Sequence, residues 1–328
     1  MTATPNRSEV TGSEVTARAV AFVAAHRESA EALGASLAEF ANDPDGFATA
    51  LTRGLASLAD PEYLAGQQRI APGIGTIHGV RWPLLAAVER GFRNETKGER
   101  STPLLFIADR LFHEPELEAR WFAFDLLERT LADETERTWQ LLRRAAREAG
   151  DWITVDSLAH PYGVGIAAEP YRWAELEQLT VSPSRWERRL VGSTIATMPY
   201  ADRRLGRAPD VTAHALPILA SLIGDADPDV QKALSWAYRS MTVVDLTETT
   251  AALETEARIA ADRDDGHRAW VIRDSLTKLD PADADRIRSR LSGIRQRTGA
   301  PSTSMAAGLA EQFAAMGLGR RMPEPPLT

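Results

Sequence analysis

Apolar side chains recur along this chain of 328 residues at intervals of three and four, as in VTARAVAFVAAHRESAEALGASLAEFA, which begins at Val15. That spacing places them along one side of an α-helix. Strict alternation of apolar and polar residues, the pattern of a half-buried strand, is nearly absent. The sequence therefore predicts an all-α protein. Beyond this first segment, the expected helices span 64–70, 81–93, 101–112, 115–130, 134–149, 151–159, 170–178, 184–197, 211–223, 227–241, 245–260, 264–278 and 281–297.

The segment DVTAHALPILASLIGDADPDVQKALSWAYRSM, residues 210–241, shows how these helices follow one another. One helix ends in a turn rich in Asp, Gly and Pro, and a second helix begins directly after it. Paired helices in units of about 40 residues are the pattern of HEAT-like repeats. HEPELEARWFAFDLLERT and VSPSRWERRLVGSTIATM repeat the pattern more weakly. Stacked units of this kind form a solenoid whose concave face binds an extended partner.

Composition along the chain predicts the domain organisation. We expect residues 1–14 to be disordered and residues 15–297 to form a single HEAT-like domain, with 15–60 as an N-terminal helical extension. Residues 298–328 are rich in Gly, Pro, Ser and Met, so we expect a flexible tail in which 304–317 is the candidate for a short helix.

Several classes of protein are excluded by what the sequence lacks. No run of about 18 apolar residues is present, so we expect no membrane-spanning helix. The N-terminus lacks the apolar segment of a secretory signal. The absence of cysteine excludes disulfides and thiolate metal sites and fits a reducing compartment. We therefore expect a cytoplasmic protein, and a monomer, without membrane contact.

Charge is distributed unevenly along the chain. The formal net charge of −8 argues against a nucleic-acid partner. Residues 185–207, however, hold six arginines against two acidic residues, a local net charge of +4. Such a run is commonly a solvated helix face, but guanidinium groups also bind phosphate bidentately. The six arginines are Arg185, Arg188, Arg189, Arg203, Arg204 and Arg207.

The familiar catalytic motifs are missing. The six histidines show no spacing typical of metal ligands, so we expect no metal site and no cofactor. APGIGTIHG contains glycines but lacks the Lys-Ser/Thr that completes a phosphate-binding loop, and no strand precedes it. We interpret this segment as a loop between helices.

Three positions on the predicted helices combine aromatic and charged side chains. Trp152 and Asp156 are four residues apart, which puts them on one helix face, one turn apart. Arg189 lies in SRWERRLVG, and Trp236 precedes Arg239 by three residues in QKALSWAYR. Taken one at a time, the tryptophans fit a helical core and the aspartate fits a solvated face.

Taken in order, DWITVDSLA, WERRLVG and VQKALSWAYR resemble the AlkD-like family of bacterial DNA alkylation-repair glycosylases, which are HEAT-like helical proteins that excise alkylated purines. The resemblance extends from about residue 60 to 297 and is strongest from 151 to 240. It implies that Trp152 and Trp236 are the aromatic walls of the site and that Asp156 is its catalytic carboxylate. It also implies that Arg189 and Arg239 hold the DNA backbone near the lesion.

We add Arg188 and Lys232, which lie next to these positions, as candidate DNA-binding residues. The sequence also departs from the family. Asp151 stands where a second aromatic residue is frequent, and Ser240 stands where an acid often follows the last arginine. The chain is more acidic and carries about 60 additional N-terminal residues. These departures bear on substrate range and on DNA affinity.

The resemblance gives the pairing of Trp152 with Asp156 a chemical meaning. An N3- or N7-alkylated purine is cationic and leaves without protonation, so the reaction requires stabilisation of positive charge on the sugar and an oriented water. One preorganised carboxylate can do both. We expect a monofunctional glycosylase that acts on such purines in double-stranded DNA without a deep base-flipping pocket. The alternative is a non-catalytic relative that binds branched or damaged DNA, or a protein partner.

Overall fold

The computed structural model describes residues 12–71 and 75–318. Within these ranges the chain is helical, apart from an isolated bridge between Thr76 and Glu116, so the all-α prediction is confirmed. Its contacts divide the chain into two compact units, residues 1–134 and 135–328, where we expected one continuous domain. Each unit is described by itself.

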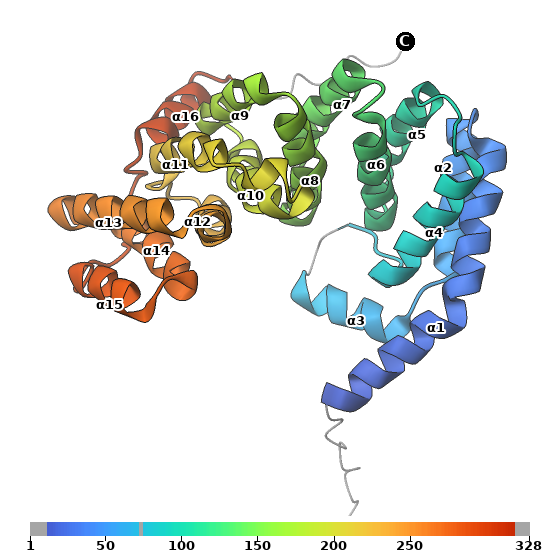
Figure 1. Ribbon diagram of the computed structural model, residues 1–328, viewed down its shortest axis with the longest axis horizontal. Coiled ribbons are helices and arrows are strands. Elements are labelled where there is room, and N and C mark those ends of the chain that lie inside the picture. The colour runs from blue at the N-terminus through green and yellow to red at the C-terminus, as the bar shows by residue number, and fades with distance from the viewer. Residues whose placement is uncertain (1–11, 72–74, 319–328) are drawn as a thin grey trace, which may run out of the picture. The chain divides into compact units, whose positions relative to one another are not determined.

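Unit 1 contains the first six helices (Figure 1). They are α1 (Gly12–Ser36), α2 (Pro44–Ser57), α3 (Pro61–Ile70), α4 (Trp82–Glu95), α5 (Thr102–Phe112) and α6 (Leu117–Thr130), with the short 3-10 helix η1 (Leu37–Phe40) after α1. Helix α2 lies inside the predicted N-terminal helical extension, residues 15–60, where its own bounds were not predicted. Asp43 caps it by accepting a hydrogen bond from the amide of Gly46 at 3.0 Å.

Unit 2 contains the remaining helices (Figure 1). They are α7 (Thr135–Glu148), α8 (Trp152–Ala168), α9 (Trp173–Gln178), α10 (Arg185–Ala201), α11 (Asp210–Leu222), α12 (Pro228–Val244), α13 (Leu246–Arg263), α14 (Gly266–Ser275), α15 (Pro281–Arg290) and α16 (Met305–Ala315). The 3-10 helices η2 (Pro170–Arg172), η3 (Leu179–Val181), η4 (Leu205–Arg207) and η5 (Leu276–Lys278) lie between them.

A nearly constant sequence separation links neighbouring helices of unit 2. Thr197 donates to the carbonyl of Ala159, 38 residues away, and Ser235 donates to Asp274, 39 residues away. Helix α10 packs between α8 and α12. Equivalent helices are therefore stacked side by side, as in an all-α helical repeat fold.

Glycine permits the closest of these helix contacts. A Cβ atom on Gly192 of α10 would lie 2.7 Å from the carbonyl carbon of Ala233 on α12. A side chain there would force the two helices apart, so the approach of α10 to α12 requires glycine at this position. Helix α10 also packs on α8, so it lies between two neighbouring helices.

Two helices continue past prolines where we predicted that they end. Helix α8 passes through Pro161 to Ala168, and α10 passes Pro199. Proline removes one backbone hydrogen bond, but in α8 the residues beyond it, Tyr162 and Ile166, are buried. The burial of these side chains outweighs the loss of the backbone hydrogen bond at Pro161, because tertiary packing supplies most of a helix's stability.

The chain ends also differ from our predictions. Helix α1 begins at Gly12, inside the segment expected to be disordered, and residues 1–11 lie outside the described ranges. In the segment expected to be a flexible tail, the amide of Thr303 donates to the carbonyl of Gly224 at 2.8 Å. Helix α16 follows and buries Ala306 and Ala307 against unit 2. The predicted short helix is therefore present and packed, while 319–328 lie outside the described ranges.

Candidate functional site

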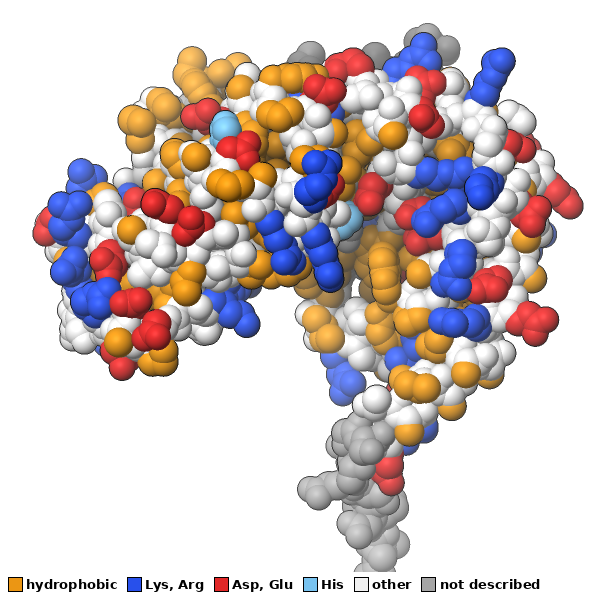
Figure 2. All heavy atoms as spheres, viewed as in Figure 1, with side chains coloured by type: hydrophobic (Ala, Val, Ile, Leu, Met, Phe, Trp, Pro, Cys, Tyr) orange, Lys and Arg blue, Asp and Glu red, His pale blue; other side chains and the backbone are white. Residues whose placement is uncertain are grey.

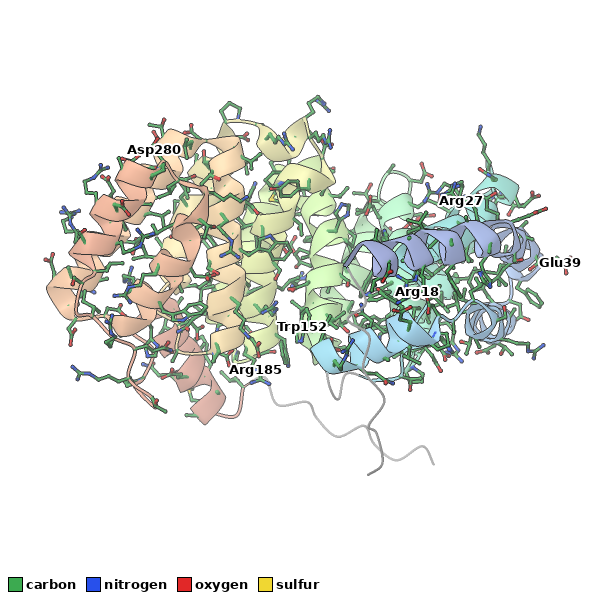
Figure 3. All side chains as sticks on the ribbon, turned by 90° about the horizontal axis from the view of Figure 1, so that it is seen from below. Arg18, Arg27, Glu39, Trp152, Arg185 and Asp280 are labelled. Atoms are coloured by element: carbon green, nitrogen blue, oxygen red, sulfur yellow. The ribbon has the colours of Figure 1, made fainter. Side chains whose placement is uncertain are left out.

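The first turns of α8 present the tryptophan and the aspartate predicted from the sequence. Asp151 caps the helix by accepting a hydrogen bond from the amide of Thr154 at 2.8 Å. This cap fixes the helix start at Trp152, so that Asp156 follows one turn later on the same face. Both side chains are partly exposed. Figure 3 shows Trp152 and Arg185, at the starts of α8 and α10, at the same edge of unit 2.

Helix α10 supplies the partners of Asp156. The Nε and Nη2 atoms of Arg189 donate to Oδ1 and Oδ2 of Asp156 at 3.0 and 2.6 Å, a bidentate pair. Ser193, one turn later, donates from Oγ to Oδ1 at 2.6 Å. Hydrogen bonds to charged groups are about twice as strong as neutral ones. The carboxylate of Asp156 is therefore held in one orientation.

Arg189 also joins this cluster to the third helix. Its Nη1 donates to the carbonyl of Asp229, in the first turn of α12, at 2.6 Å. The indole of Trp152 lies beside the same guanidinium, with 5.9 Å between Cζ and the ring centroid. The side chain of Arg189 is 7% exposed and that of Asp156 is 21% exposed. The structure thus brings Trp152, Asp156 and Arg189 together at the junction of α8, α10 and α12.

Helix α12 carries the other predicted residues on one face. Lys232 is exposed, while Trp236 and Arg239 are partly exposed. Arg239 pairs with Asp274 of α14, with 2.6 Å between Nη1 and Oδ2, rather than with Asp156. Its side chain is 27% exposed and that of Asp274 is 47% exposed. An arginine in this setting can exchange its carboxylate for another anion at small cost.

The pKa of the Asp274 carboxyl is lowered from its ordinary value. Partial burial raises this pKa. The hydrogen bonds from Ser235 and Arg239 and the charge of Arg239 lower it, and together they outweigh the effect of burial. The Ser235 hydroxyl donates to Oδ2 at 2.7 Å. Asp274 therefore holds the guanidinium of Arg239 at the surface of α12.

Arg188, a predicted DNA-binding residue, makes an ion pair and hydrogen bonds within unit 2. Its Nε donates to Asp225 at 2.8 Å, and Asp225 is 1% exposed. Its Nη1 donates to the carbonyl of Ser182 at 2.8 Å. Adjacent residues on a helix point about 100° apart, so Arg188 turns inward to the loop before α12 while Arg189 turns to α8. The side chain of Arg188 is 10% exposed, and its contact with DNA stays a prediction.

Three residues of these clusters, Ser193, Ser235 and Asp274, were not predicted from the sequence. Ser193 follows Arg189 by four residues, so its place on the same helix face could have been inferred. Asp274 follows Arg239 by 35 residues and lies on another helix. Nothing in the local sequence pattern indicates that pairing.

Within residues 12–71 and 75–318, no group of three or more His, Asp or Glu side chains could hold a metal ion. No described helix is both long enough and apolar enough to cross a membrane.

The sequence model of a family described as DNA alkylation repair enzyme matches residues 51–279. The matched segment runs from α2 to the end of η5 and includes the helices that carry Asp156, Arg189 and Trp236. No curated protein matches the chain.

Proposed function

Because the chain belongs to the DNA alkylation repair enzyme family, we propose that it is a monofunctional DNA glycosylase that releases N3- and N7-alkylated purines from duplex DNA. One observation carries the proposal. Asp156 is oriented by Arg189 and Ser193 of α10, and it remains partly exposed beside the indole of Trp152. A carboxylate prepared in this way, next to an aromatic surface, suits a reaction that develops positive charge.

The leaving group sets what the protein must supply. Alkylation at N3 or N7 makes the purine cationic, which weakens its bond to the sugar. The base then departs with the bonding electrons and becomes neutral, while positive charge develops on the sugar. A fixed anion close to the sugar stabilises that charge without reorganisation during the reaction, which is commonly the largest catalytic effect.

Asp156 can meet this requirement while it is paired with Arg189. A carboxylate offers about four lone-pair positions. Contacts with described residues occupy two positions on Oδ1 and one on Oδ2. The remaining position on Oδ2 can accept a hydrogen bond from the attacking water and direct its oxygen at the sugar. As the new C–O bond forms, the water transfers a proton to Oδ2 of Asp156, and the carboxyl then releases it to solvent.

The tryptophans supply an apolar, electron-rich surface. The face of an indole attracts a cation at distances below about 6 Å. It also excludes water, which strengthens the field of the neighbouring carboxylate. We propose that Trp152 and Trp236, on α8 and α12, contact the alkylated nucleotide and its neighbours.

We propose different roles for the two paired arginines. The Nε, Nη1 and Nη2 atoms of Arg189 all donate within the protein, so Arg189 acts as a positioning residue for Asp156. Arg239 is more exposed, and Lys232 lies two turns before it on α12. These two cations are suited to phosphates of the DNA backbone, which position DNA without reading its sequence.

The proposal assigns no residue to protonate the departing base. His160 follows Asp156 by four residues and lies within α8. It takes part in an interaction of its own. We therefore restrict the proposed substrates to purines that are already cationic. Neutral bases such as uracil, hypoxanthine and 1,N6-ethenoadenine depend on protonation or on a fitted pocket.

The test is a panel of duplexes, each containing one damaged base, incubated with excess protein and assayed for free base and for abasic sites. We expect release of 7-methylguanine and 3-methyladenine and of larger N3 or N7 adducts. Efficient release of uracil or hypoxanthine would contradict the mechanism. Binding to duplex DNA without release of any base would favour the non-catalytic alternative.

A further inference from the structure

The arginine-rich segment 185–207 is divided by the structure into two groups. Arg188 and Arg189 are buried in ion pairs near the start of α10, and Arg185 lies 3.7 Å from Asp227. Arg203 and Arg204, by contrast, are exposed at the opposite end of α10. The proposed function therefore uses only one end of this helix, and the exposed cations at the other end have no role in it.

A well-defined turn presents these exposed cations. Asp202 ends α10 and accepts hydrogen bonds from the amides of Arg204 and Leu205, each at 2.8 Å. Those amides lower the pKa of the Asp202 carboxyl. A Cβ atom on Gly206 would lie 2.0 Å from the carbonyl oxygen of Met198, so only glycine lets the turn fold back onto the helix.

An aromatic ring lies within the same surface. Arg207 donates from Nε to the carbonyl of Pro199 at 2.8 Å, and its Cζ lies 5.9 Å from the centroid of the Tyr200 ring. Tyr200 is 54% exposed. We name this surface, made of Tyr200, Arg203, Arg204 and Arg207, the cationic turn. Figure 2 shows Lys and Arg side chains gathered on the lower edge of unit 2 near the end of α10.

Along the chain, the cationic turn holds more arginines than acids. Within residues 198–209 the acid is Asp202, whose Oδ1 accepts from backbone amides. Asp210 begins α11 directly afterwards and is exposed. Residues 198–210 therefore carry three guanidinium groups and two carboxylates. Guanidinium forks next to an exposed phenol suit the phosphates and sugars of a nucleic-acid backbone.

The distance to the candidate site allows a single duplex to reach both surfaces. Arg189 and Arg203 are 14 positions apart, almost entirely along α10. At 1.5 Å per residue this separation is roughly 20 Å. It corresponds to about six base-pair steps at 3.4 Å each.

We propose that the cationic turn is a second, sequence-independent binding surface for the phosphate backbone of the duplex whose damaged base lies at Asp156. The identity of the duplex rests on the proposed function, whereas the phosphate-binding chemistry does not. This surface gives a chain of net charge −8 a local means to hold DNA. Each phosphate contact releases condensed counterions, so its contribution weakens as salt rises.

The experiment compares the full chain with its Arg203→Ala/Arg204→Ala double variant. Affinity for an undamaged duplex of about 25 base pairs is measured across a series of salt concentrations. We expect the slope of log K against log salt to fall in magnitude by about 2, and the affinity near 0.1 M salt to fall on the order of tenfold. Base release at saturating protein should stay within about twofold, because the chemistry lies at the other end of α10.

The matched control is Arg258→Ala/Arg263→Ala on α13, which removes the same charge from two other exposed positions of unit 2. Circular dichroism and thermal unfolding establish that both variants are folded. An unchanged slope in Arg203→Ala/Arg204→Ala overturns the proposal, and so does an equal loss in the control. A third outcome is that the wild-type protein binds the duplex, and the double variant shows the expected fall in slope, without release of any base. In that case the proposed function fails and the cationic turn stands.

Discussion

Unit 2 builds the same three kinds of side chain into two clusters. Asp156 of α8 accepts hydrogen bonds from Arg189 and Ser193 of α10, and Asp274 of α14 accepts them from Arg239 and Ser235 of α12. In each cluster the arginine and the serine are four residues apart, so one helix face carries both. Their order is reversed, with arginine first in α10 and serine first in α12.

Burial distinguishes the two clusters. Arg189 and Asp156 are 7% and 21% exposed, whereas Arg239 and Asp274 are 27% and 47% exposed. Arg189 makes a further hydrogen bond to the carbonyl of Asp229 across to a third helix. The two Arg–Asp ion pairs therefore differ in what they hold in place. The more buried pair fixes the carboxylate of Asp156, and the more exposed pair presents the guanidinium of Arg239.

The largest expected difference between the clusters concerns base release. We expect Asp156→Asn to lower the single-turnover rate by about two orders of magnitude or more, the usual scale for one electrostatic stabiliser. Asp274→Asn should lower it by less than about threefold at saturating protein, because Asp274 only holds Arg239. The measurement is release of 7-methylguanine from a duplex under single-turnover conditions.

Affinity for undamaged duplex is the control for these two variants, since Asn keeps the shape of the side chain and should leave binding nearly intact. Equal rates in wild type and Asp156→Asn would remove Asp156 as the catalytic carboxylate. Equal losses in both variants would mean that the two clusters do not differ in the way their burial indicates.

The second expected difference concerns stability. Arg189→Ala leaves Asp156 without its guanidinium and the Asp229 carbonyl without its donor. We expect the free energy of unfolding to fall by about 2 kcal/mol. This is less than the usual cost of breaking a fully buried ion pair, because Ser193 and solvent still reach the carboxylate. Arg239→Ala should cost less than about 1 kcal/mol, as is typical of exposed pairs. Urea unfolding at pH 7 measures both, and the contrast fails if Arg239→Ala proves the more destabilising.

Local patterns were sufficient to predict much of the fold and part of the site. The three- and four-residue spacing predicted the all-α fold, and the spacing of Trp152 and Asp156 predicted that they share a helix face. Helix α2, inside the predicted helical extension 15–60, shows the same kind of signal in Phe47, Leu51 and Leu55, which are four residues apart and buried.

The remaining features depend on contacts between distant segments. The sequence does not reveal that Arg188 meets Asp225, 37 residues away, while its neighbour Arg189 meets Asp156. Both arginines lie in the same charged run, and only the packing of α10 between two helices assigns each a partner. The continuation of α8 past Pro161 also depends on packing, because local propensity favours a break there.

The smallest expected effect tests the exposed cluster by its pH dependence. Hydrogen bonds and charge lower the pKa of Asp274 in the folded protein, despite an opposing contribution from partial burial. A carboxyl whose pKa is lowered on folding stabilises the folded state above its unfolded pKa, about 3.9, and this stabilisation disappears as pH falls through the folded value. Asp274→Asn should therefore be less stable than wild type at pH 7, by less than about 1 kcal/mol because solvent screens the pair. The difference should shrink when urea unfolding is repeated near pH 3. A difference that stays constant between the two pH values would mean that the Asn variant loses packing rather than charge, and that Asp274 does not hold Arg239 electrostatically.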